Sequence, residues 1–507
     1  MIFSSMEFVC VFLPAVFLLH CLAPGIRGKN LLLMVASLLF YAYGEPVYVL
    51  LMACSAGFSY LAARLVAPRA SLDSGVNPGA SLDSGVNPGA RAGLDSSASP
   101  GKRYRKWLLF AAVALNLSLL AFFKYAAFFL ENVNQLMGME LEMPEISLPV
   151  GISFFTFQAL SYVFDVYYGR VQVEKNFGRV LLYIAFFPQL VAGPIVKYRD
   201  VSQALEGRRL SLGQASAGMR RFICGLGKKV LIANTVGQAA DVIFGAPYAE
   251  IGTCAAWIGA AAYMLQIYYD FSGYSDMAIG LGQMFGFQFQ ENFNYPYSAS
   301  TIKDFWRRWH ISLSSWFREY LYIPLGGNRR GKVRTGLNRL AVFFLTGLWH
   351  GANWTFVIWG LYHGLLASLE DLLPFVKKIP KAITWLPTLL AVCVGFVIFR
   401  ADTISQGVFF LRQMFAFQPM AGQDMTLALR QLTPWFLTMA AVGVAGMAPI
   451  RPLAGWIKDT IRKGEEEASW KTAPLQAALN IGSLGILLWC LVRLSAGTYN
   501  PFIYFRF

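Results

Sequence analysis

Long apolar stretches recur along the chain and are separated by shorter polar segments. A helix needs about 20 consecutive apolar residues to cross a hydrocarbon core about 30 Å thick, so these stretches predict membrane helices. The expected stretches are 7–24, 30–44, 46–67, 107–128, 150–169, 179–196, 230–247, 251–269, 340–372 with a break at 350–353, 382–399, 432–449 and 475–496. The pattern predicts an all-α polytopic membrane protein with about 11 or 12 transmembrane helices.

Charge is unevenly divided among the polar segments. Lys and Arg outnumber Asp and Glu by six to three in 68–106, eight to two in 197–229 and nine to two in 301–339, whereas 129–148 has four Glu and no Lys or Arg. The positive-inside rule therefore puts the three basic segments on the cytoplasmic side and 129–148 on the opposite side. Two full crossings at 150–169 and 179–196 would reverse the side of the segment that follows. One of the two is therefore expected to be re-entrant, and Gly193 with Pro194 favours the second.

Composition excludes an ordinary soluble enzyme. Hydrophobic residues make up 56% of the 507-residue chain and charged residues only 14%. The net charge of +15 is typical of a membrane protein whose basic cytoplasmic loops meet anionic lipid, and no segment resembles a nucleic-acid-binding module. The seven cysteines lack the spacing of a disulfide framework or a metal site.

The chain is expected to form one membrane domain, 1–507, interrupted by a linker. Residues 71–90 are a tandem copy of SLDSGVNPGA, which has no apolar face to bury. The segment 71–100 is therefore predicted to be a flexible cytoplasmic linker.

The stretch 301–354 concentrates the candidate chemistry and contains two of the four histidines. Within it, 303–322 has aromatic and aliphatic residues at helical spacing, with basic residues on the opposite face. This pattern predicts one helix in the membrane interface that starts at a capping box of Thr301 and Asp304. His310 falls at the edge of the aromatic stripe.

His350 is expected deep in the bilayer. It follows Arg339, the last charge before an apolar run, by eleven residues, which corresponds to a depth of about 16 Å. An ionisable side chain near the midplane, beside a helix break, indicates a functional site that faces a polar cavity.

A second polar group lies at 267–297, between two membrane segments. Its polar residues predict either a substrate pocket or structural support, in which Asp270 and Asp276 would neutralise Arg307 and Arg308. Support is the favoured interpretation for the two aspartates.

Several long motifs resemble the membrane-bound O-acyltransferase family, and within it the branch of alginate O-acetyltransferase membrane subunits. The motifs are LPVGISFFTFQALSYVFDVYYG at 148–169, DFSGYSDMAIGLGQMFGF from Asp270, ENFNYPY from Glu291, DFWRRWHISLSSWFREYLYIPLGGNRRG from Asp304, LWHGANWTFVIWG from Leu348 and NPFIYFRF at 500–507. The resemblance implies a ring of transmembrane helices, with re-entrant and interfacial helices, around a central tunnel. The tunnel would open to the cytoplasm for an acyl thioester and to the other face for the acceptor. His350 matches the near-invariant histidine of the family and His310 its second polar position.

Acyl transfer to an alcohol gives the histidine a chemical role. An imidazole can take the hydroxyl proton as the tetrahedral intermediate forms, so His350 is the expected general base. His310, Trp309 or Asn353 could donate to the oxyanion, and His310 could instead orient the thioester. No Ser-His-Asp set or G-x-S-x-G motif occurs, so direct transfer is expected, with a transient acyl-enzyme as the alternative.

The candidate residues fall into three groups. The catalytic pair is His350 and His310, and no metal is expected. The candidates for lining the tunnel are Asp270, Tyr274, Asp276, Asn292, Trp306, Trp309 and Asn353. The candidates for the donor mouth are Arg329, Arg330, Lys332 and Arg334. The basic loop suits the phosphates of acyl-CoA, although ordinary positive-inside bias explains it equally well. His20 and His363 are expected to be packing residues.

The resemblance implies a multi-pass enzyme of the bacterial inner membrane. It would move acetyl groups from acetyl-CoA or another cytoplasmic thioester across the inner membrane for O-acetylation of an exopolysaccharide such as alginate. No permanently bound cofactor is expected, and periplasmic acetylation proteins would serve as acceptor or relay. The alternatives are D-alanyl transfer to teichoic acid, acetylation of cellulose, or a polysaccharide or lipid transporter, although no repeat of matched halves supports a transporter.

Overall fold

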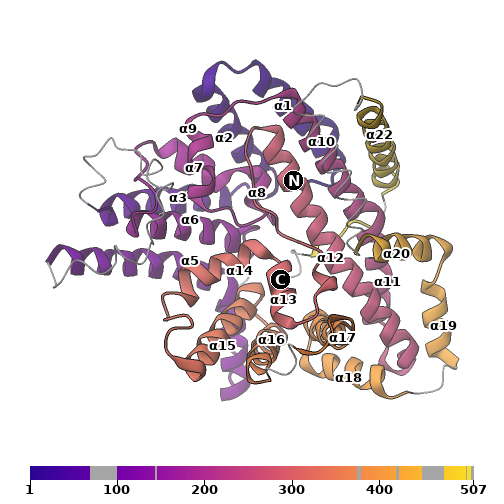
Figure 1. Cartoon of the computed structure of the whole chain (residues 1–507). Coiled ribbons are helices and arrows are strands. Elements are labelled where there is room, and N and C mark those ends of the chain that lie inside the picture. Colours follow the sequence, from indigo (N-terminus) through magenta and orange to yellow (C-terminus); the bar gives the residue numbers. More distant parts are fainter. Residues whose placement is uncertain are drawn as a thin grey trace. The chain divides into compact units, whose positions relative to one another are not determined.

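The computed structural model describes residues 1–68, 100–142, 146–373, 378–417, 422–447, 473–497 and 499–503. Within these ranges every regular element is a helix and there is no strand (Figure 1). The predicted all-α class is thus confirmed. Residues 71–99 of the predicted linker lie outside the described residues.

The contacts of the chain gather in two compact units. The smaller unit is Leu18–Val191 with Ile195–Arg208, and the larger is Met1–Phe17, Ala192–Pro194 and Arg209–Phe507. The helices of the smaller unit are α2 (Gly25–Gly44), α3 (Tyr48–Val66), α5 (Pro100–Met137), α6 (Ile152–Tyr167), α7 (Phe177–Ala185), α8 (Phe187–Leu190) and α9 (Tyr198–Glu206). Nearly every residue of α6 is buried, so α6 is the core helix of this unit.

The stretch predicted at 179–196 is not one continuous helix. It is divided between α7 and α8, which have nine and four residues. At 1.5 Å per residue, α7 is about 14 Å long, too short to cross a hydrocarbon core. Gly151, directly before α6, has a φ of 78°, and a Cβ there would lie 2.7 Å from the carbonyl oxygen of Leu190. This close approach, which glycine permits, fixes the start of α6 against the end of α8.

The larger unit is built around α12. Its helices are η1 (Phe8–Phe12), α10 (Leu212–Gly227), η3 (Lys228–Ala233), α11 (Asn234–Phe244), η4 (Tyr248–Glu250), α12 (Thr253–Met284), η5 (Pro296–Ser298), α13 (Ile302–Arg308), α14 (Ile311–Phe317), η6 (Arg318–Tyr322), α15 (Gly331–His350), α16 (Trp354–Leu372), α17 (Lys381–Arg400), α18 (Ile404–Phe415), α19 (Gly422–Gln431), α20 (Pro434–Met447) and α22 (Ala473–Ser495). Helix α1 (Leu13–Leu22) begins in this unit. Gly218 and Gly225 of α10 face Gly280 and Gly273 of α12, and a Cβ on any of them would meet a backbone oxygen within 2.8 Å. Glycine at these positions therefore allows the two helices to pack backbone to backbone.

The prediction of a single helix at 303–322 is wrong. The segment forms α13, α14 and η6, with a break at His310, whose φ is 44°. At the break, Ile311 N donates to the carbonyl of Asn292 at 3.0 Å and Asn294 N donates to the carbonyl of Arg308 at 2.9 Å. The segment around Asn292 thus takes the hydrogen bonds that a continuous helix would have made itself. Of the predicted capping box, the Thr301 half is confirmed, because Thr301 Oγ1 accepts from Asp304 N at 3.0 Å. The Asp304 carboxylate pairs with Arg307 and Arg308.

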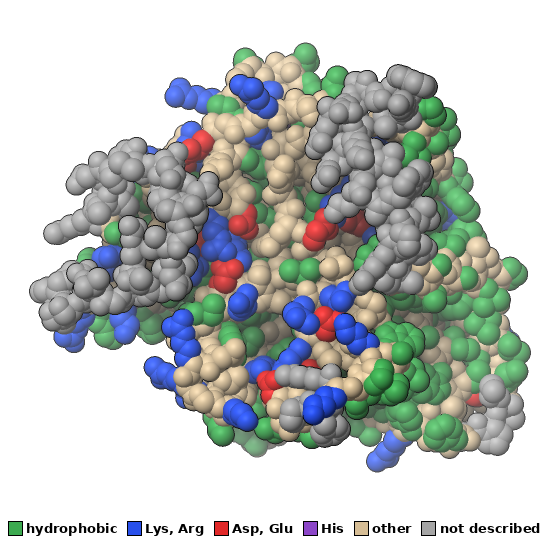
Figure 2. All heavy atoms as spheres, viewed as in Figure 1, with side chains coloured by type: hydrophobic (Ala, Val, Ile, Leu, Met, Phe, Trp, Pro, Cys, Tyr) green, Lys and Arg blue, Asp and Glu red, His purple; other side chains and the backbone are tan. Residues whose placement is uncertain are grey.

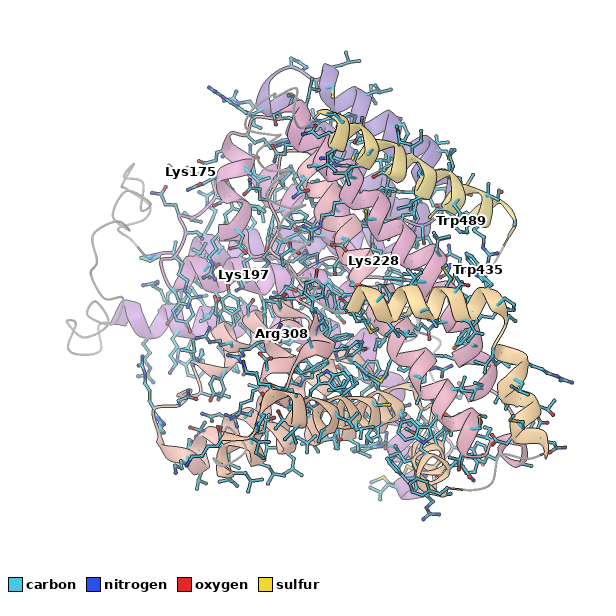
Figure 3. The ribbon with its side chains drawn as sticks, turned by 45° about the vertical axis from the view of Figure 1, so that its right-hand side comes forward. Lys175, Lys197, Lys228, Arg308, Trp435 and Trp489 are labelled. Carbon is cyan, nitrogen blue, oxygen red and sulfur yellow. The ribbon has the colours of Figure 1, made fainter. Side chains whose placement is uncertain are left out.

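Membrane character is carried by apolar helices. Among the described helices, four are long and apolar enough to cross a membrane by themselves: Tyr48–Val66, Arg103–Met137, Lys381–Arg400 and Pro474–Ser495. Phe8–Leu22 and Pro434–Met447 are shorter apolar helices. The multi-pass prediction is confirmed, and the count of 11 or 12 crossings stays a prediction. Figure 3 labels Trp435 of α20 and Trp489 of α22, whose ring centroids lie 5.4 Å apart.

Candidate active site

His350 is the last residue of α15, and its position follows from how α15 packs against α16. A Cβ at Gly347 would meet the carbonyl oxygen of Phe356, and one at Gly360 would meet that of Phe343. Glycine at both positions lets the two backbones come together. The predicted break at 350–353 is confirmed, since α15 ends at His350 and α16 begins four residues later.

Asn353 shapes the turn after His350. Its Oδ1 accepts from the backbone N–H of Thr355 at 3.0 Å, and its Nδ2 donates to the carbonyl of Asp402 at 2.9 Å. Both ends of the amide are therefore used to cap α16 and hold the turn. This geometry favours a supporting role for Asn353 over donation to an oxyanion.

His350 is 7% exposed and forms part of the wall of a small cavity. The cavity has a volume of about 20 Å³ and is lined by Ile267, Phe271, Trp309, His350, Trp359, Phe396, Phe399 and Ile503. The ring of His350 lies 5.2 Å from Trp359 and 5.1 Å from Phe399, both edge to face. The wall is otherwise apolar and aromatic, so the imidazole is the one titratable side chain among the described residues that line it. A space of this size holds a group about as large as one water molecule.

His310 lies at the break between α13 and α14 and is 1% exposed. Its ring centroid is 4.6 Å from that of Phe271, which lines the small cavity. Trp349 contacts both histidines, with ring centroids 6.0 Å from His310 and 5.0 Å from His350. The structure thus brings together the two histidines that the sequence pairs as catalytic.

The hydrogen bonds of Asn292 determine which nitrogen of His310 carries the proton. Asn292 Oδ1 accepts from the backbone N–H of Ser312 at 3.2 Å, which identifies this atom as the amide oxygen. His310 Nδ1 lies 3.2 Å from the same oxygen and must therefore be the donor. The Nε2 of His310 is left as an acceptor, and it has no hydrogen-bond partner among the residues that the structure describes.

Burial, together with the positive charge that a protonated His350 would carry, lowers the pKa of His310 well below its usual range. His310 is therefore neutral near pH 7. A neutral ring with its proton on Nδ1 can accept a hydrogen bond at Nε2 but cannot donate one there. Of the two roles predicted for His310, this tautomer favours orienting a substrate group over donating to an oxyanion.

Asp270 anchors the C-terminal segment against α12. Its carboxylate lies 2.6 Å from Lys229 Nζ, with both side chains almost fully buried, and its Oδ2 accepts from Ile503 N at 2.9 Å. Lys229 also donates to the carbonyl of Pro501. Ile503 lines the small cavity, so this buried ion pair positions part of the cavity wall. Asp270 itself does not line it.

Asp276 and Tyr274 of α12 make different kinds of contact. Asp276 pairs with Arg221 at 2.8 Å and with Lys228, labelled in Figure 3, at 2.6 Å. Tyr274 packs between aromatic rings, with centroids 4.6 Å from Phe3 and 4.8 Å from Phe502. Neither lines the small cavity.

The predicted pairing of Asp270 and Asp276 with Arg307 and Arg308 is wrong. Both arginines instead bind Asp304, each at 2.9 Å. These pairs are three and four residues apart on one helical turn, the spacing at which side chains of a helix meet.

A second, larger cavity has a volume of about 430 Å³. Its wall includes the aromatic rings of Trp306, Phe317, Tyr322 and Phe343 and the cations Lys303, Arg307, Arg318 and Arg339. Figure 2 shows Lys and Arg side chains gathered over the elements that form it, in the lower half of the view. A cavity with basic and aromatic walls suits a ligand with both anionic and ring groups.

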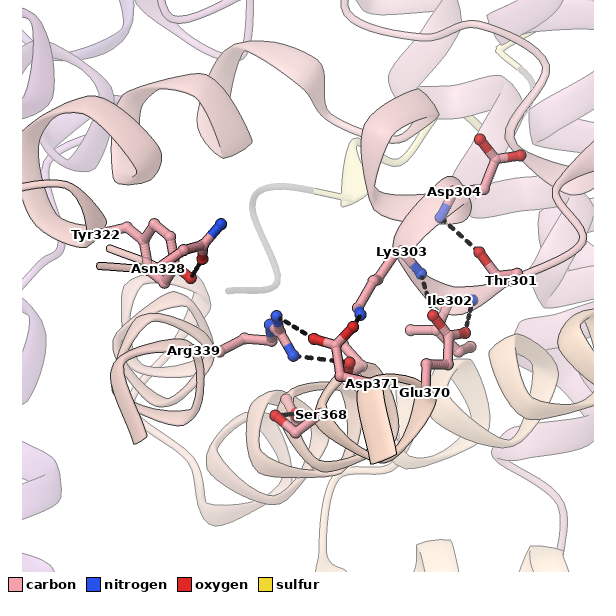
Figure 4. Close-up of polar contacts among 12 residues, drawn as sticks. Thr301, Ile302, Lys303, Asp304, Tyr322, Asn328, Arg339, Ser368, Glu370 and Asp371 are labelled. Atoms are coloured by element: carbon pink, nitrogen blue, oxygen red, sulfur yellow. Dashed lines mark hydrogen bonds and ion pairs between the residues drawn. The ribbon is translucent and has the colours of Figure 1, made fainter. Parts of the chain in front are cut away.

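Acidic residues of α16 bind two of these cations and the start of α13 (Figure 4). Asp371 binds Lys303 and also Arg339, the latter at 2.8 Å. Glu370 accepts from the backbone N–H groups of Ile302 and Lys303 at the start of α13. Arg318 is exposed and forms no ion pair among the described residues, so its charge is available to an anionic ligand.

The predicted donor-mouth residues do not line either cavity. Arg329, Arg330, Lys332 and Arg334 are exposed around the start of α15. The cations of the larger cavity, except Arg339, come earlier in the chain, from α13 and η6. Sequence reasoning missed these cations, together with Trp359, Phe399 and Ile503. The one available signal was the terminal NPFIYFRF motif.

Comparisons with known proteins identify the family of the chain. The sequence model of the membrane-bound O-acyltransferase family matches residues 115–400, which include both histidines. The chain is 37% identical to the probable alginate O-acetylase AlgI of Azotobacter vinelandii, over the full length of both chains. It is 35% identical to the peptidoglycan O-acetyltransferase of Helicobacter pylori, over 82% of this chain and 80% of that one. It is 32% identical to the teichoic acid D-alanyltransferase of Bacillus subtilis, over 49% of this chain and 68% of that one.

Proposed function

Because the chain belongs to the membrane-bound O-acyltransferase family, we propose that it takes an acetyl group from a cytoplasmic acyl thioester, with His350 as general base, for O-acetylation of an exopolysaccharide such as alginate. It is thus a multi-pass membrane enzyme. The observation that carries the proposal is His350 in the wall of a small, otherwise apolar and aromatic cavity. A base in such a site is surrounded by little competing water.

The proposed chemistry uses two groups at this cavity. As the acceptor hydroxyl oxygen attacks the thioester carbonyl, His350 takes the hydroxyl proton. Trp359 Nε1 is buried and has no partner among the described residues, so it can donate to the oxyanion that forms. The carbon–sulfur bond then breaks, and His350 returns the proton to the leaving thiolate.

The size of the small cavity supports a short acyl group. A volume of about 20 Å³ has room for a methyl-sized group. The full-length likeness to a probable alginate O-acetylase makes a polysaccharide hydroxyl the preferred acceptor.

The larger cavity is the proposed entrance for the donor. Acyl-CoA carries phosphates and an adenine ring, and the cavity offers cations and aromatic faces to both. Donor binding is therefore expected to weaken as salt is raised.

Arg318→Gln tests this entrance. We expect it to raise the KM for acetyl-CoA about tenfold, the size expected from losing one charge-assisted contact. The control replaces Arg329, Arg330, Lys332 and Arg334 together by Gln, which removes four charges that line neither cavity. Both variants are assayed at low and high salt with matched membrane abundance. A normal KM for Arg318→Gln with a raised KM for the loop variant would contradict the proposed entrance and indicate that the donor enters at the loop.

Deletion of the gene tests the function as a whole. Mass spectrometry of the exopolysaccharide from the deletion strain is expected to show a polymer of normal amount that lacks O-acetyl groups. Wild-type protein should restore these groups and His350→Ala should not. Loss of the polymer itself would support a transporter, and loss of acetyl groups from peptidoglycan alone would replace the proposed acceptor.

A further inference from the structure

His363 of α16 is fully buried, yet neither ring nitrogen has a hydrogen-bond partner among the described residues. A neutral imidazole carries one donor and one acceptor. Leaving such groups buried and unsatisfied is destabilising, and an apolar residue of similar size would avoid that cost. Packing, the role expected from the sequence, does not account for the choice of histidine here.

The position of His363 lies between the two cavities. Along α16, Ala367 lines the larger cavity and Trp359 lines the smaller, and His363 is four residues from each. Residues four apart share one face of a helix, so the three side chains form one stripe. The stripe spans eight residues, or about 12 Å.

A second stripe, on α15, also extends from the larger cavity to the smaller one. Phe343 and Thr346 line the larger cavity, and His350 lines the smaller. Because α15 and α16 pack closely, both stripes lead from the basic cavity to the catalytic histidine.

The surroundings of His363 add further unsatisfied donors. Its ring centroid lies 5.4 Å from Trp306 and 5.2 Å from Trp359. The indole N–H groups of both tryptophans are also buried without a partner among the described residues. On α17, a Cβ at Gly395 would lie 2.6 Å from His363 Nε2, so glycine leaves room for this ring.

We propose that His363 is a donor-positioning residue that hydrogen-bonds the amide-containing arm of a coenzyme A-type thioester between the two cavities. The inference rests on the proposed function, since it needs a donor that enters through the larger cavity. An amide group has one N–H donor and one carbonyl acceptor, which complements the neutral imidazole. The adjacent indole N–H of Trp306 suits a further carbonyl of the same arm. The arm thus satisfies groups that are unsatisfied without it and guides the thioester toward His350.

Equilibrium binding to the full-length purified protein tests this inference with two probes. Coenzyme A contains the arm, and adenosine 3′,5′-bisphosphate has the phosphates and adenine without it. His363→Leu is expected to weaken coenzyme A binding about tenfold, as for one lost hydrogen bond, and to leave bisphosphate binding unchanged. His363→Asn keeps one donor and one acceptor and should restore most of the affinity. His20→Leu, a buried histidine of α1 that lines neither cavity, is the control and should change neither Kd.

Thermal unfolding without ligand separates binding from packing. His363→Leu should be at least as stable as wild type, because it removes an unsatisfied polar group. Unchanged coenzyme A binding in His363→Leu, or equal weakening for both probes with a lower Tm, overturns the inference. If the wild type binds neither probe, the proposed donor is wrong and this inference is overturned with it.

Discussion

His350→Ala is expected to lower acetyl transfer about 10²–10⁴-fold, the usual contribution of a general base, while the protein still folds and inserts. The reason is the position of the imidazole in the wall of the small cavity, where no other titratable side chain among the described residues can replace it. The measurement is acetyl transfer from purified donor to acceptor, at equal membrane abundance and with thermal stability checked. His350→Gln, which keeps a polar side chain of similar size but cannot act as a base at neutral pH, should show the same loss.

His20→Ala is the matched control for the loss of a buried histidine, since His20 lines neither cavity. It should retain transfer activity in proportion to the amount of folded protein. If a well-folded His350→Ala protein kept more than about a tenth of wild-type turnover, the loss of rate would be smaller than the usual contribution of a general base. That result would remove His350 from this role.

Asp270→Ala should be the most destabilising single change in the larger unit. It leaves the charge of Lys229, whose side chain is 3% exposed, buried without its partner. Breaking a buried ion pair in this way costs about 3–5 kcal/mol, a large part of the stability of an ordinary domain. It also frees the backbone N–H of Ile503, so the C-terminal segment should detach and transfer activity should fall with stability. Thermal unfolding in detergent measures the first effect and acetyl transfer the second.

Asp276→Ala is the matched control on the same helix. Its partners Arg221 and Lys228 have side chains 23% and 33% exposed, so its loss should cost less. The double variant Lys229→Met with Asp270→Leu should regain much of the lost stability, because an apolar pair can replace a buried ion pair. Its activity should stay low, since Pro501 and Ile503 have still lost their anchors. An Asp270→Ala protein as stable and active as wild type would show that the ion pair does not hold the segment.

Features that depend on local sequence were predictable. Apolar runs predict where helices lie, because burying a run of apolar residues needs no knowledge of the neighbour. The break at 350–353, the Thr301 cap and the interruption of 179–196 were likewise signalled by helix-breaking or capping residues within a few positions. The two candidate histidines were predictable because ionisable residues are rare in apolar sequence.

Features that depend on contacts between distant segments were decided only by the tertiary structure. The break at His310 exists because the segment around Asn292 takes its backbone hydrogen bonds, a competition invisible in the helical pattern of 303–322. Asp270 pairs with Lys229 instead of Arg307 because α12 packs against η3, which is another contact between separate segments. Likewise, the C-terminal Ile503, Phe399 of α17 and Trp359 of α16 meet at His350 only after folding. Helical periodicity tells which face of a helix is buried but not which other face it meets, and the residues that surround His350 depend on that second choice.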